Sequence, residues 1–358
     1  MIKDFGWSDA LQAAFEPHAA AGLSPARVVA HHRGLWRLVT DAGDCAGRLS
    51  GRFAAEAGAG EHPVVGDWLA ISRVDGGDGD ALIHALMPRK SAFARRAAGG
   101  VGVQIVAANV DIAFLVAALN NDLNPRRLER YLIAARDSGA TPVVVLTKAD
   151  LSSDLDAERQ AVIDIAAGAP VVTLSALTGE GVEALQRWLL PGVTAALLGS
   201  SGAGKSTLLN ALAGKELMST GAVREGDDRG RHTTTHRELF RLAGGALLID
   251  TPGMRELGLV ADEAALDESF ADITALIPLC RFSDCTHASE PGCAILAAQA
   301  DGSLSAERWQ SYLKLQRELA FVVRKEDPAA EAANKTRWKQ IHKTQRAKYK
   351  HRQDNEGG

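Results

Sequence analysis

The pattern of apolar residues changes near residue 100 of this chain of 358 residues. Before that point, short apolar runs are separated mostly by Gly, Asp or Pro, at 26–34, 35–40, 45–53, 64–72 and 81–87. Short strands bounded by such turn residues are typical of small all-β domains. The runs predict an OB-fold β-barrel, with a β-sandwich as the alternative. The basic and Gly-rich stretch at 88–100 is expected to be a linker or an exposed loop.

The second part of the chain has continuous apolar runs that end in polar residues or Gly, at 111–119, 141–150, 170–177, 194–201 and 245–253. Helical patterns lie between some of them, at 125–139 and 181–190. Continuous apolar strands that alternate with helices predict a parallel sheet covered on both faces. Ligands of such sheets bind at the carboxyl ends of the strands.

The last part of the chain holds a Cys/His cluster, a helical pattern at 306–323 and a basic tail. We therefore expect a multidomain protein with three parts. An OB-fold domain spans 1–97, an α/β domain spans 98–270, and a mainly helical domain with the Cys/His cluster and the basic tail spans 271–358.

The stretch GSSGAGKS at 199–206 has the spacing of a phosphate-binding loop, G-x-x-x-x-G-K-[ST]. Its glycines let backbone N–H groups approach phosphates, and the helix that follows directs its positive N-terminus to the same place. Lys205 is expected to reach the β- and γ-phosphates and to act in catalysis, and Ser206 to hold Mg²⁺. The predicted nucleotide-binding residues of this loop are Gly199, Ser200, Ser201, Gly202, Ala203, Gly204, Lys205, Ser206 and Thr207.

Two further motifs complete a nucleotide site. In DTPG at 250–253, Asp250 can hold Mg²⁺ through water, and the Gly253 N–H can sense the γ-phosphate. In TKAD at 147–150, the Asp150 carboxylate can accept from guanine N1–H and the 2-amino group, and the Lys148 stem can cover the base. The SAL stretch at 175–177 follows the next strand, and the backbone of Ser175 and Ala176 is placed to contact the guanine oxygen.

The order of these motifs is permuted. An ordinary GTPase runs from the phosphate loop through DxxG to the base-recognition motif, whereas here base recognition at 147–150 precedes the phosphate loop at 199–206. A compact domain has its chain ends close together and tolerates permutation. The consequence is that the chain leaving DTPG leads directly into the C-terminal part.

With this permuted order, the sequence closely resembles the ribosome small-subunit-dependent GTPase A family of bacterial assembly factors, over nearly the whole chain. The resemblance implies an OB-fold domain at 1–97 that binds RNA or the ribosome, a circularly permuted GTPase domain at 98–270 and a zinc-binding domain at 271–358. It also implies GTP hydrolysis to GDP and phosphate stimulated by the small ribosomal subunit, and a role in late maturation of that subunit. One departure is Thr147, where the family pattern has Asn; Thr is shorter but keeps a hydroxyl.

The resemblance also makes GRHTTTHREL at 230–239 the first switch. Thr234 is expected to close on Mg²⁺. Many small GTPases place Gln directly after the DxxG glycine to orient the attacking water, but here that residue is Met254. Turnover by the chain alone is therefore expected to be slow, with His232 positioning the water once the small subunit is bound.

The segment CRFSDCTHASEPGC at 280–293 spaces three thiols and one imidazole as C-x4-C-x-H-x5-C. Cys280, Cys285, His287 and Cys293 can saturate tetrahedral Zn²⁺, which predicts one structural zinc site without an open position. The spacing also matches the family. The alternative is a set of buried cysteines without metal.

Charge separates the tail from the rest of the chain. Between Asn334 and Arg352 there are eight Lys or Arg residues and no acid, although the net charge of the chain is −4. Basic side chains interleaved with Trp338 and Tyr349 can neutralise phosphates and stack on bases. With the resemblance, this predicts contact with ribosomal RNA, and Arg89, Lys90, Arg95 and Arg96 form a weaker second basic patch.

The remaining expectations concern location and alternatives. The N-terminus lacks an apolar core of signal-peptide length, and no stretch approaches the length of a membrane span, so we expect a cytoplasmic monomer without membrane contact. Two other functions remain open: an RNA-binding module stabilised by GTP with negligible turnover, and an ATP-dependent kinase, which would leave TKAD unexplained. The leading prediction is a GTP hydrolase with GTP or GDP, Mg²⁺ and Zn²⁺ as its ligands.

Overall fold

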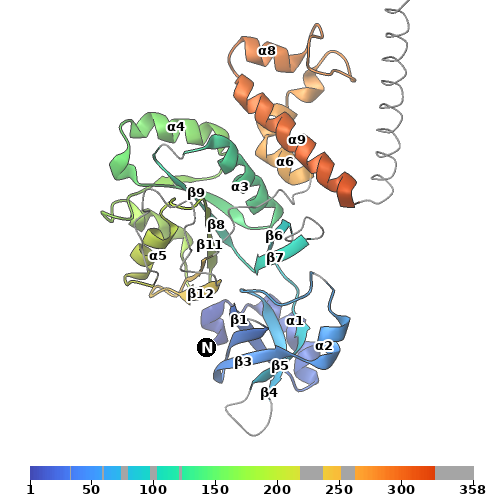
Figure 1. Cartoon of the computed structure of the whole chain (residues 1–358), viewed down its shortest axis with the longest axis vertical. Helices are drawn as coiled ribbons and strands as arrows, with labels where there is room; N and C mark the ends of the chain where they lie inside the picture. The colour runs from blue at the N-terminus through green and yellow to red at the C-terminus, as the bar shows by residue number, and fades with distance from the viewer. Residues whose placement is uncertain are drawn as a thin grey trace, which may run out of the picture.

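The computed structural model describes residues 1–32, 34–58, 60–73, 80–96, 103–120, 123–217, 237–250 and 263–326. Figure 1 shows three parts in a row: a barrel at the N-terminus, a central sheet with helices on both faces, and a group of C-terminal helices beside α3. The order of these parts is the one expected from the apolar pattern.

The described elements and their bounds, in chain order, are η1 (Ile2–Phe5), α1 (Asp9–Ala20), β1 (Ser24–His32), β2 (Leu35–Thr40), β3 (Gly43–Leu49), α2 (Gly51–Glu56), β4 (Trp68–Arg73), β5 (Ala81–Leu86), β6 (Ala92–Arg96), β7 (Val103–Ala108), β8 (Ile112–Ala118), α3 (Pro125–Asp137), β9 (Thr141–Thr147), η2 (Ala149–Leu151), α4 (Leu155–Ile165), β10 (Val171–Thr173), η3 (Val182–Trp188), β11 (Thr194–Gly199), α5 (Lys205–Ala213), β12 (Glu238–Arg241), β13 (Leu247–Asp250), α6 (Glu263–Ser269), α7 (Ala271–Thr274), η5 (Ile277–Leu279), α8 (Ala294–Ala300) and α9 (Ala306–Glu326).

The first five strands form a closed barrel. Their order is β1-β2-β3-β5-β4, and β4 also pairs with β1, so the sheet closes on itself. Strands β3 and β5 are parallel and the other neighbours antiparallel. Apolar side chains at alternating strand positions fill the interior, among them Leu38, Leu69 and Ile83, each fully buried. The predicted barrel is confirmed, and closure excludes the β-sandwich.

The central sheet has the order β10-β9-β8-β11-β13-β12. All neighbours are parallel except β12, which runs antiparallel to β13 and pairs on its other side with β1 of the barrel. β11, which leads into the phosphate loop, therefore lies between β8 and β13. The sequence did not indicate β12, because it has only four residues and follows a polar segment.

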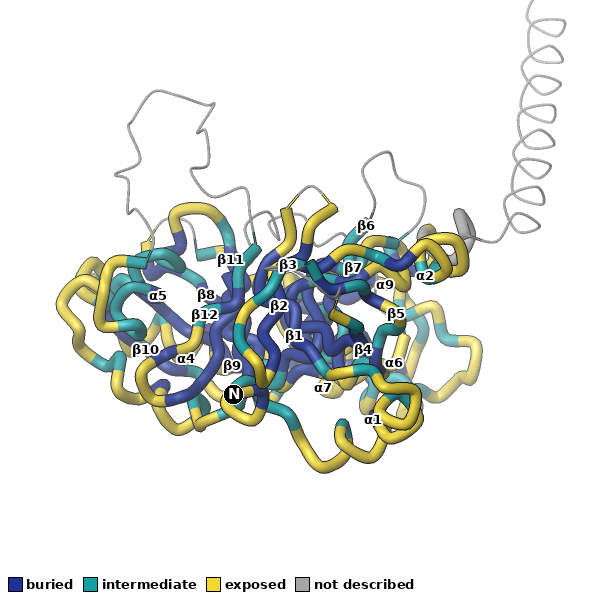
Figure 2. The backbone as a smooth tube through the Cα atoms, turned by 90° about the horizontal axis from the view of Figure 1, so that it is seen from below, coloured by how far each residue is buried: buried dark blue, intermediate teal, exposed yellow. Residues whose placement is uncertain are grey.

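Buried residues concentrate in the strands of both sheets, and the helices expose their outer faces (Figure 2). One apolar cluster continues from the barrel interior to the face of the central sheet that packs against α3. A second cluster covers the opposite face, under α5 and η3. The barrel and the nucleotide domain therefore share a core instead of being joined by a free linker.

A buried arginine holds the junction between the two sheets. Arg27 on β1 donates to Thr194 Oγ1, the first residue of β11, at 2.8 Å, and to the carbonyl oxygen of Gly66 at 3.3 Å. Asn109 Nδ2 donates to the same Gly66 oxygen at 3.0 Å. Burial lowers the pKa of Arg27 to about 10, so the guanidinium remains charged at neutral pH. Gly66 has φ +94°, and a Cβ there would lie 2.0 Å from the Ala108 oxygen, so no other residue fits.

The C-terminal helices dock on α3 through a buried charge network. Arg308 on α9 pairs with Glu129 on α3 at 2.7 Å and with Asp272 on α7 at 2.9 Å. Ser311 Oγ also donates to Glu129. Removing one partner of a buried pair leaves an uncompensated charge, at a typical cost of about 3–5 kcal/mol. Ile133 of α3 packs into the same helical core, so this docking is both ionic and apolar.

Two local predictions were wrong. Residues 51–53, expected to continue a strand, begin the helix α2, because Ser50 accepts a hydrogen bond from the Phe53 N–H and caps it. The stretch at 88–100, expected to be a linker or loop, contains β6, which pairs antiparallel with β7. Local composition gave no sign of that pairing, because Ala and Arg dominate β6.

The domain limits stay predictions. The expected limit at 97/98 falls between β6 and β7, which pair with each other. The expected limit at 270/271 falls next to α6, whose Leu266 packs with α9 residues such as Trp309 in the C-terminal core.

No helix among the described residues has both the length and the apolar character that a membrane crossing requires.

Candidate functional site

The predicted nucleotide motifs meet at one edge of the central sheet. Thr147 ends β9, Gly199 ends β11 and Asp250 ends β13, and these strands run parallel in one sheet. The carboxyl ends of parallel strands lie at the same edge, so residues 147–150, 199–206 and Asp250 converge there although they are far apart in the sequence. The SAL stretch follows β10 at the same edge.

The phosphate loop has the backbone that its glycines predict. Gly202 and Gly204 have φ +75° and +86°, in the left-handed region that favours glycine. A Cβ on Gly199 would lie 2.3 Å from the Val116 oxygen, so only glycine fits where the loop leaves β11. Lys205 begins α5, and its Nζ donates to the carbonyl oxygens of Gly199 at 2.9 Å and Ser200 at 2.5 Å. The lysine is thus held over the loop, beside the positive end of the helix.

The base-recognition residues follow a sharp change of backbone direction. Lys148 has φ +59°, and the short helix η2 that carries Asp150 starts directly after it. Asp150 is exposed at this edge, and its carboxylate is available to a base. Ala149 N–H donates to the Leu174 oxygen at 3.2 Å, which fixes η2 against the segment that carries Ser175 and Ala176. Ser175 is buried and Ala176 half-buried, so their backbone is held in place by packing.

Thr147 connects the base-recognition motif at 147–150 with the phosphate loop at 199–206. Its hydroxyl donates to the carbonyl oxygen of Ala203, inside the phosphate loop, at 2.7 Å. The side chain is buried, and its Oγ1 also lies 3.4 Å from the Cβ position of Gly204. A larger side chain at this position would crowd the loop. Thr in place of Asn therefore fits the site, because the shorter side chain still links TKAD to the phosphate loop by a hydrogen bond.

Replacing Thr147 with Val should weaken nucleotide binding about tenfold. Valine keeps the shape but leaves the buried Ala203 oxygen without its donor, which typically costs about 1–3 kcal/mol. Titration of the protein into a fluorescent mant-GDP solution measures the Kd. Thr147→Ser keeps the hydroxyl and is the matched control. Equal affinity of the Val variant and the wild type would show that this hydrogen bond does not support the loop.

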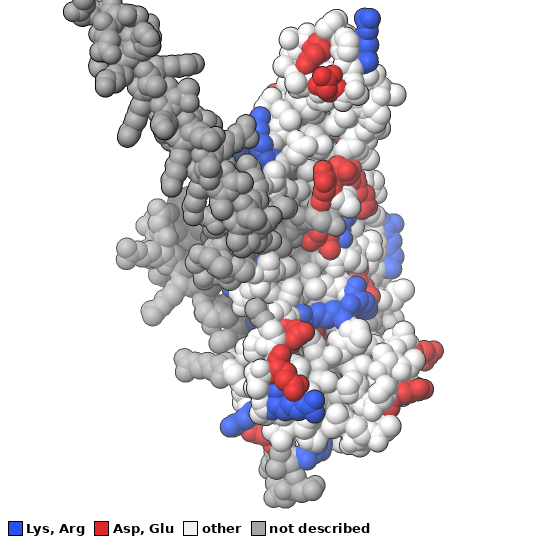
Figure 3. All heavy atoms as spheres, turned by 90° about the vertical axis from the view of Figure 1, so that its right-hand side faces the viewer, with Lys and Arg blue, Asp and Glu red and all other residues white. Residues whose placement is uncertain are grey.

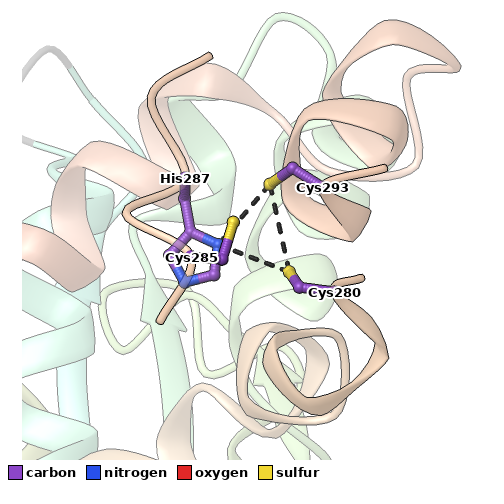
Figure 4. Close-up of side chains that lie close together, drawn as sticks. All are labelled: Cys280, Cys285, His287 and Cys293. Atoms are coloured by element: carbon purple, nitrogen blue, oxygen red, sulfur yellow. Dashed lines mark hydrogen bonds between the residues drawn. The ribbon is translucent and has the colours of Figure 1, made fainter. Parts of the chain in front are cut away.

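The four predicted zinc ligands are brought together. Figure 4 shows the side chains of Cys280, Cys285, His287 and Cys293 close together. Their ligand atoms all lie within 4.8 Å of one another. His287 Nδ1 is 3.5 Å from both Cys280 Sγ and Cys293 Sγ, and these two sulfurs are 4.0 Å apart. Around tetrahedral Zn²⁺, bond lengths of about 2.3 Å to sulfur and 2.0–2.1 Å to nitrogen place two sulfurs about 3.8 Å apart and sulfur and nitrogen about 3.5 Å apart. The donor set and its spacing fit Zn²⁺.

The surroundings hold the ligands in place. Glu290 accepts from the Thr286 hydroxyl and from the backbone N–H groups of Thr286, Ala288 and Ser289, and these bonds hold its pKa far below the ordinary range. They close the loop that carries His287, whose φ is +58°. The His287 ring also packs edge-on against Trp309 of α9, with centroids 5.4 Å apart. The Cys/His cluster is thus part of the C-terminal core, in line with a structural role for the predicted zinc ion.

Several predicted residues lie outside the described part of the chain. They are Thr234, His232, Gly253, Met254 and the basic tail at 334–352. Their roles stay predictions. The sequence indicated neither the hydrogen bond of Thr147 to the phosphate loop nor the contact of Glu290 with the loop that carries His287. Glu290 lies inside the predicted metal motif, but so does Asp284, at the same distance from His287 in the sequence.

Two family models match the chain. The model described as RsgA GTPase matches residues 86–260. A second, described as 50S ribosome-binding GTPase, matches 194–343 and so begins at Thr194, the first residue of β11. An ordinary GTPase domain starts at the strand before its phosphate loop, so a match that starts there agrees with a permuted order.

Relatives and solved structures cover most of the chain. A protein of Opitutus terrae named small ribosomal subunit biogenesis GTPase RsgA is 49% identical over 360 residues, covering 97% of this chain and 97% of its own. The chain belongs to the RsgA GTPase family. A relative from Listeria monocytogenes, named RsgA 2, is 44% identical and covers 98% of this chain and 99% of its own. The structure of YjeQ from Thermotoga maritima is 26% identical, with a TM-score of 0.61 over 83% of this chain and 99% of that one. The structure of YloQ, a circularly permuted GTPase, shares the fold with a TM-score of 0.58, at 21% identity over 83% of this chain and 95% of that one.

Membership of the RsgA family makes the chain a GTP hydrolase, which agrees with the site. In this reaction water attacks the γ-phosphorus, the bond from that phosphorus to the β,γ-bridging oxygen breaks, and GDP leaves. Catalysis is mainly positioning and charge stabilisation. The backbone of the phosphate loop and the Lys205 ammonium are placed to stabilise negative charge on the phosphates. Mg²⁺, which the GTPase domain implies, neutralises phosphate charge when bound, and Ser206 and Asp250 are the described residues that would hold it.

Proposed function

We propose that this RsgA family member binds the small ribosomal subunit together with GTP, hydrolyses GTP faster when bound there, and assists late maturation of the subunit. The observation that carries the proposal is the agreement of the whole chain with relatives named small ribosomal subunit biogenesis GTPase, over 97% of its length. The barrel, the permuted site and the metal cluster are all included in that agreement. A cytoplasmic monomer that contacts ribosomal RNA is part of the proposal.

The roles of individual residues belong to the same proposal. Asp150 selects guanine, with Thr147, Lys148, Ser175 and Ala176 around the base. The phosphate loop at 199–207 binds the phosphates, and Lys205 stabilises the charge that develops on them. Mg²⁺ is held by Ser206, Asp250 and Thr234, Gly253 senses the γ-phosphate, and His232 positions the water. Cys280, Cys285, His287 and Cys293 hold one structural zinc ion.

The basic tail at 334–352 is proposed as the main RNA contact. On the face drawn in Figure 3, the described surface carries small separate groups of both signs, and its described part shows no broad basic area. The tail concentrates eight basic residues without an acid. Contacts of basic side chains with phosphates release counterions and make binding depend steeply on salt.

GTP turnover with and without ribosomal subunits tests this function. Purified small subunits should raise the turnover number more than about tenfold, which is about 1.4 kcal/mol of transition-state stabilisation or more. Large subunits are the control, and they matter because one matching family model is described as a 50S ribosome-binding GTPase. Equal stimulation by both subunits, or none by either, would contradict the proposal. Tight GTP binding without turnover would favour an RNA-binding module stabilised by GTP.

A further inference from the structure

One row of cross-strand partners runs from the barrel to the nucleotide site. Arg37 on β2 is paired with Ala30 on β1, and Ala30 with Glu238 on β12. Glu238 is paired with Asp250 on β13, and Asp250 with Leu197 on β11. In Figure 1, β12 lies between the barrel and the rest of the central sheet. Neighbouring strands are about 4.8 Å apart, so four short steps link the barrel surface to the strand of the phosphate loop.

An ion pair spans the domain junction along this row. Arg37 Nη2 donates to Glu238 Oε1, although the two residues lie on strands separated by β1. Paired residues point to the same face of a sheet. Ala30, which lies between Arg37 and Glu238, is small and buried, so its side chain does not obstruct their ion pair. The Arg37 side chain is 50% exposed and that of Glu238 is 33% exposed. A partner in solution can therefore reach Arg37.

The next pair in the row places two acids opposite each other. Glu238 and Asp250 are direct partners in an antiparallel pair, a geometry that brings Cβ atoms to about 4.5–5.5 Å and disfavours like charges. Asp250 is 7% exposed, so water screens it poorly. Arg37 offsets the charge of Glu238. Whether Arg37 is paired with Glu238 therefore sets how negative the electrostatic potential at Asp250 is.

The junction around the pair is rich in basic groups. Arg237 precedes Glu238, and its Nε is buried without a hydrogen-bond partner among the described residues. Burial and the neighbouring His32 have the larger effects on His31 of β1, and Arg237 adds to them in lowering the pKa of that imidazole. Arg237 therefore adds positive charge at the junction, while the exposed Arg37 is the side chain that the phosphate oxygens of RNA can contact.

We propose that Arg37 and Glu238 are positioning residues that couple the barrel to the magnesium aspartate, Asp250. This rests on the proposed function, since the phosphates are those of the small subunit. When RNA phosphates draw Arg37 away, the Glu238 carboxylate is no longer offset. The surroundings of Asp250 become more negative, and a divalent cation is held there more tightly beside the GTP phosphates. Subunit contact at the barrel is in this way linked to turnover.

The test uses two neutralising substitutions with opposite expected effects. Without subunits, Arg37→Gln frees Glu238 and should lower the Mg²⁺ concentration that half-saturates binding of a mant-labelled, non-hydrolysable GTP analogue by at least about threefold. Glu238→Gln removes the carboxylate and should raise that concentration by a similar factor. In both variants the ratio of subunit-stimulated to basal turnover should fall at least about threefold. An ion pair that only stabilises the fold would shift the Mg²⁺ requirement in the same direction in both.

Arg48→Gln is the matched control. Arg48 and Asp80, both in the barrel domain, form an exposed ion pair at 2.8 Å. Its loss is expected to leave both the Mg²⁺ requirement and the stimulation ratio unchanged. The Mg²⁺ titration needs neither subunits nor hydrolysis, so it is independent of the proposed function. If wild-type turnover is not stimulated by subunits, the proposed function fails while the titration still decides the coupling. Shifts of equal sign, or no shift in either variant, would overturn the coupling of Arg37 and Glu238 to Asp250.

Discussion

Replacing Asp150 with Asn should turn the protein from a guanine-nucleotide into a xanthine-nucleotide binder. In the proposed site the carboxylate accepts from guanine N1–H and from its 2-amino group, and an amide cannot accept both. Sites that hydrogen-bond a substrate reject analogues without those groups by about 10⁴- to 10⁵-fold, so the affinity for GTP should fall by about 10³-fold or more. Xanthine carries an oxygen in place of the 2-amino group, which the Asn amide can donate to. Direct titration of each protein with mant-GDP, mant-XDP and mant-ADP measures the change.

A neighbouring aspartate provides the control. Asp154 is four residues further along the chain and caps α4 by accepting from the Ala157 N–H at 3.2 Å. Asparagine caps a helix about as well as aspartate, so Asp154→Asn removes one charge near the site without loss of structure. It should keep the preference for GTP. If Asp150→Asn also keeps that preference, the assignment of base recognition to TKAD is wrong, and tight binding of mant-ADP by the wild type would favour a kinase.

Loss of zinc should unfold the C-terminal helices while nucleotide binding persists. Structural zinc sites contribute apparent free energies of about 10–16 kcal/mol in zinc-finger peptides, and that energy is folding energy. Cys293 is buried in the same core as Trp309 and Phe270, so removing the metal should release that core. Cys285→Ser, or a strong chelator, should therefore lower the tryptophan near-UV circular dichroism and the metal content. The Kd for mant-GDP should change less than about threefold, because the phosphate loop packs on the apolar cluster under α5 and η3 and not on the C-terminal core.

Metal analysis of freshly purified protein gives the direct check. One equivalent of zinc is expected, and less than about half an equivalent, without chelator, would contradict the site. Cys45→Ser is the matched control, since Cys45 lies in β3 of the barrel, away from the cluster. It should keep full zinc content. A Cys285→Ser protein with unchanged zinc and unchanged circular dichroism would show that these four residues do not form the metal site.

Much of the fold could be predicted from the sequence because the signals are local. The alternation of continuous apolar runs with helical patterns indicated the central parallel sheet, and the short runs before residue 97 indicated the barrel. The elements that escaped prediction are short or depend on a distant partner. β6 is rich in Ala and Arg and exists through its pairing with β7, and β12 has four residues between β13 and the barrel strand β1.

The sequence by itself determined the chemistry of the nucleotide and metal sites. A phosphate loop works through its own backbone, so GSSGAGKS carries its function in eight consecutive residues. The predicted zinc ligands fall within fourteen residues, from Cys280 to Cys293, and short loops bring such ligands together with little help from the rest of the chain. The permuted order was visible for the same reason, since it is the order of local motifs.

Only the tertiary structure decided how the parts act on one another. Arg37 and Glu238 are 201 residues apart, and Arg308 and Glu129 are 179 apart. Thr147 and the Ala203 oxygen are 56 residues apart. The four charged side chains are ordinary in their local sequence, and Thr147, although part of TKAD, shows no sign there of its bond to the phosphate loop. All of them gain these contacts from strand register or helix docking. Register and docking depend on the packing of whole faces against one another, and no short stretch of sequence records that packing.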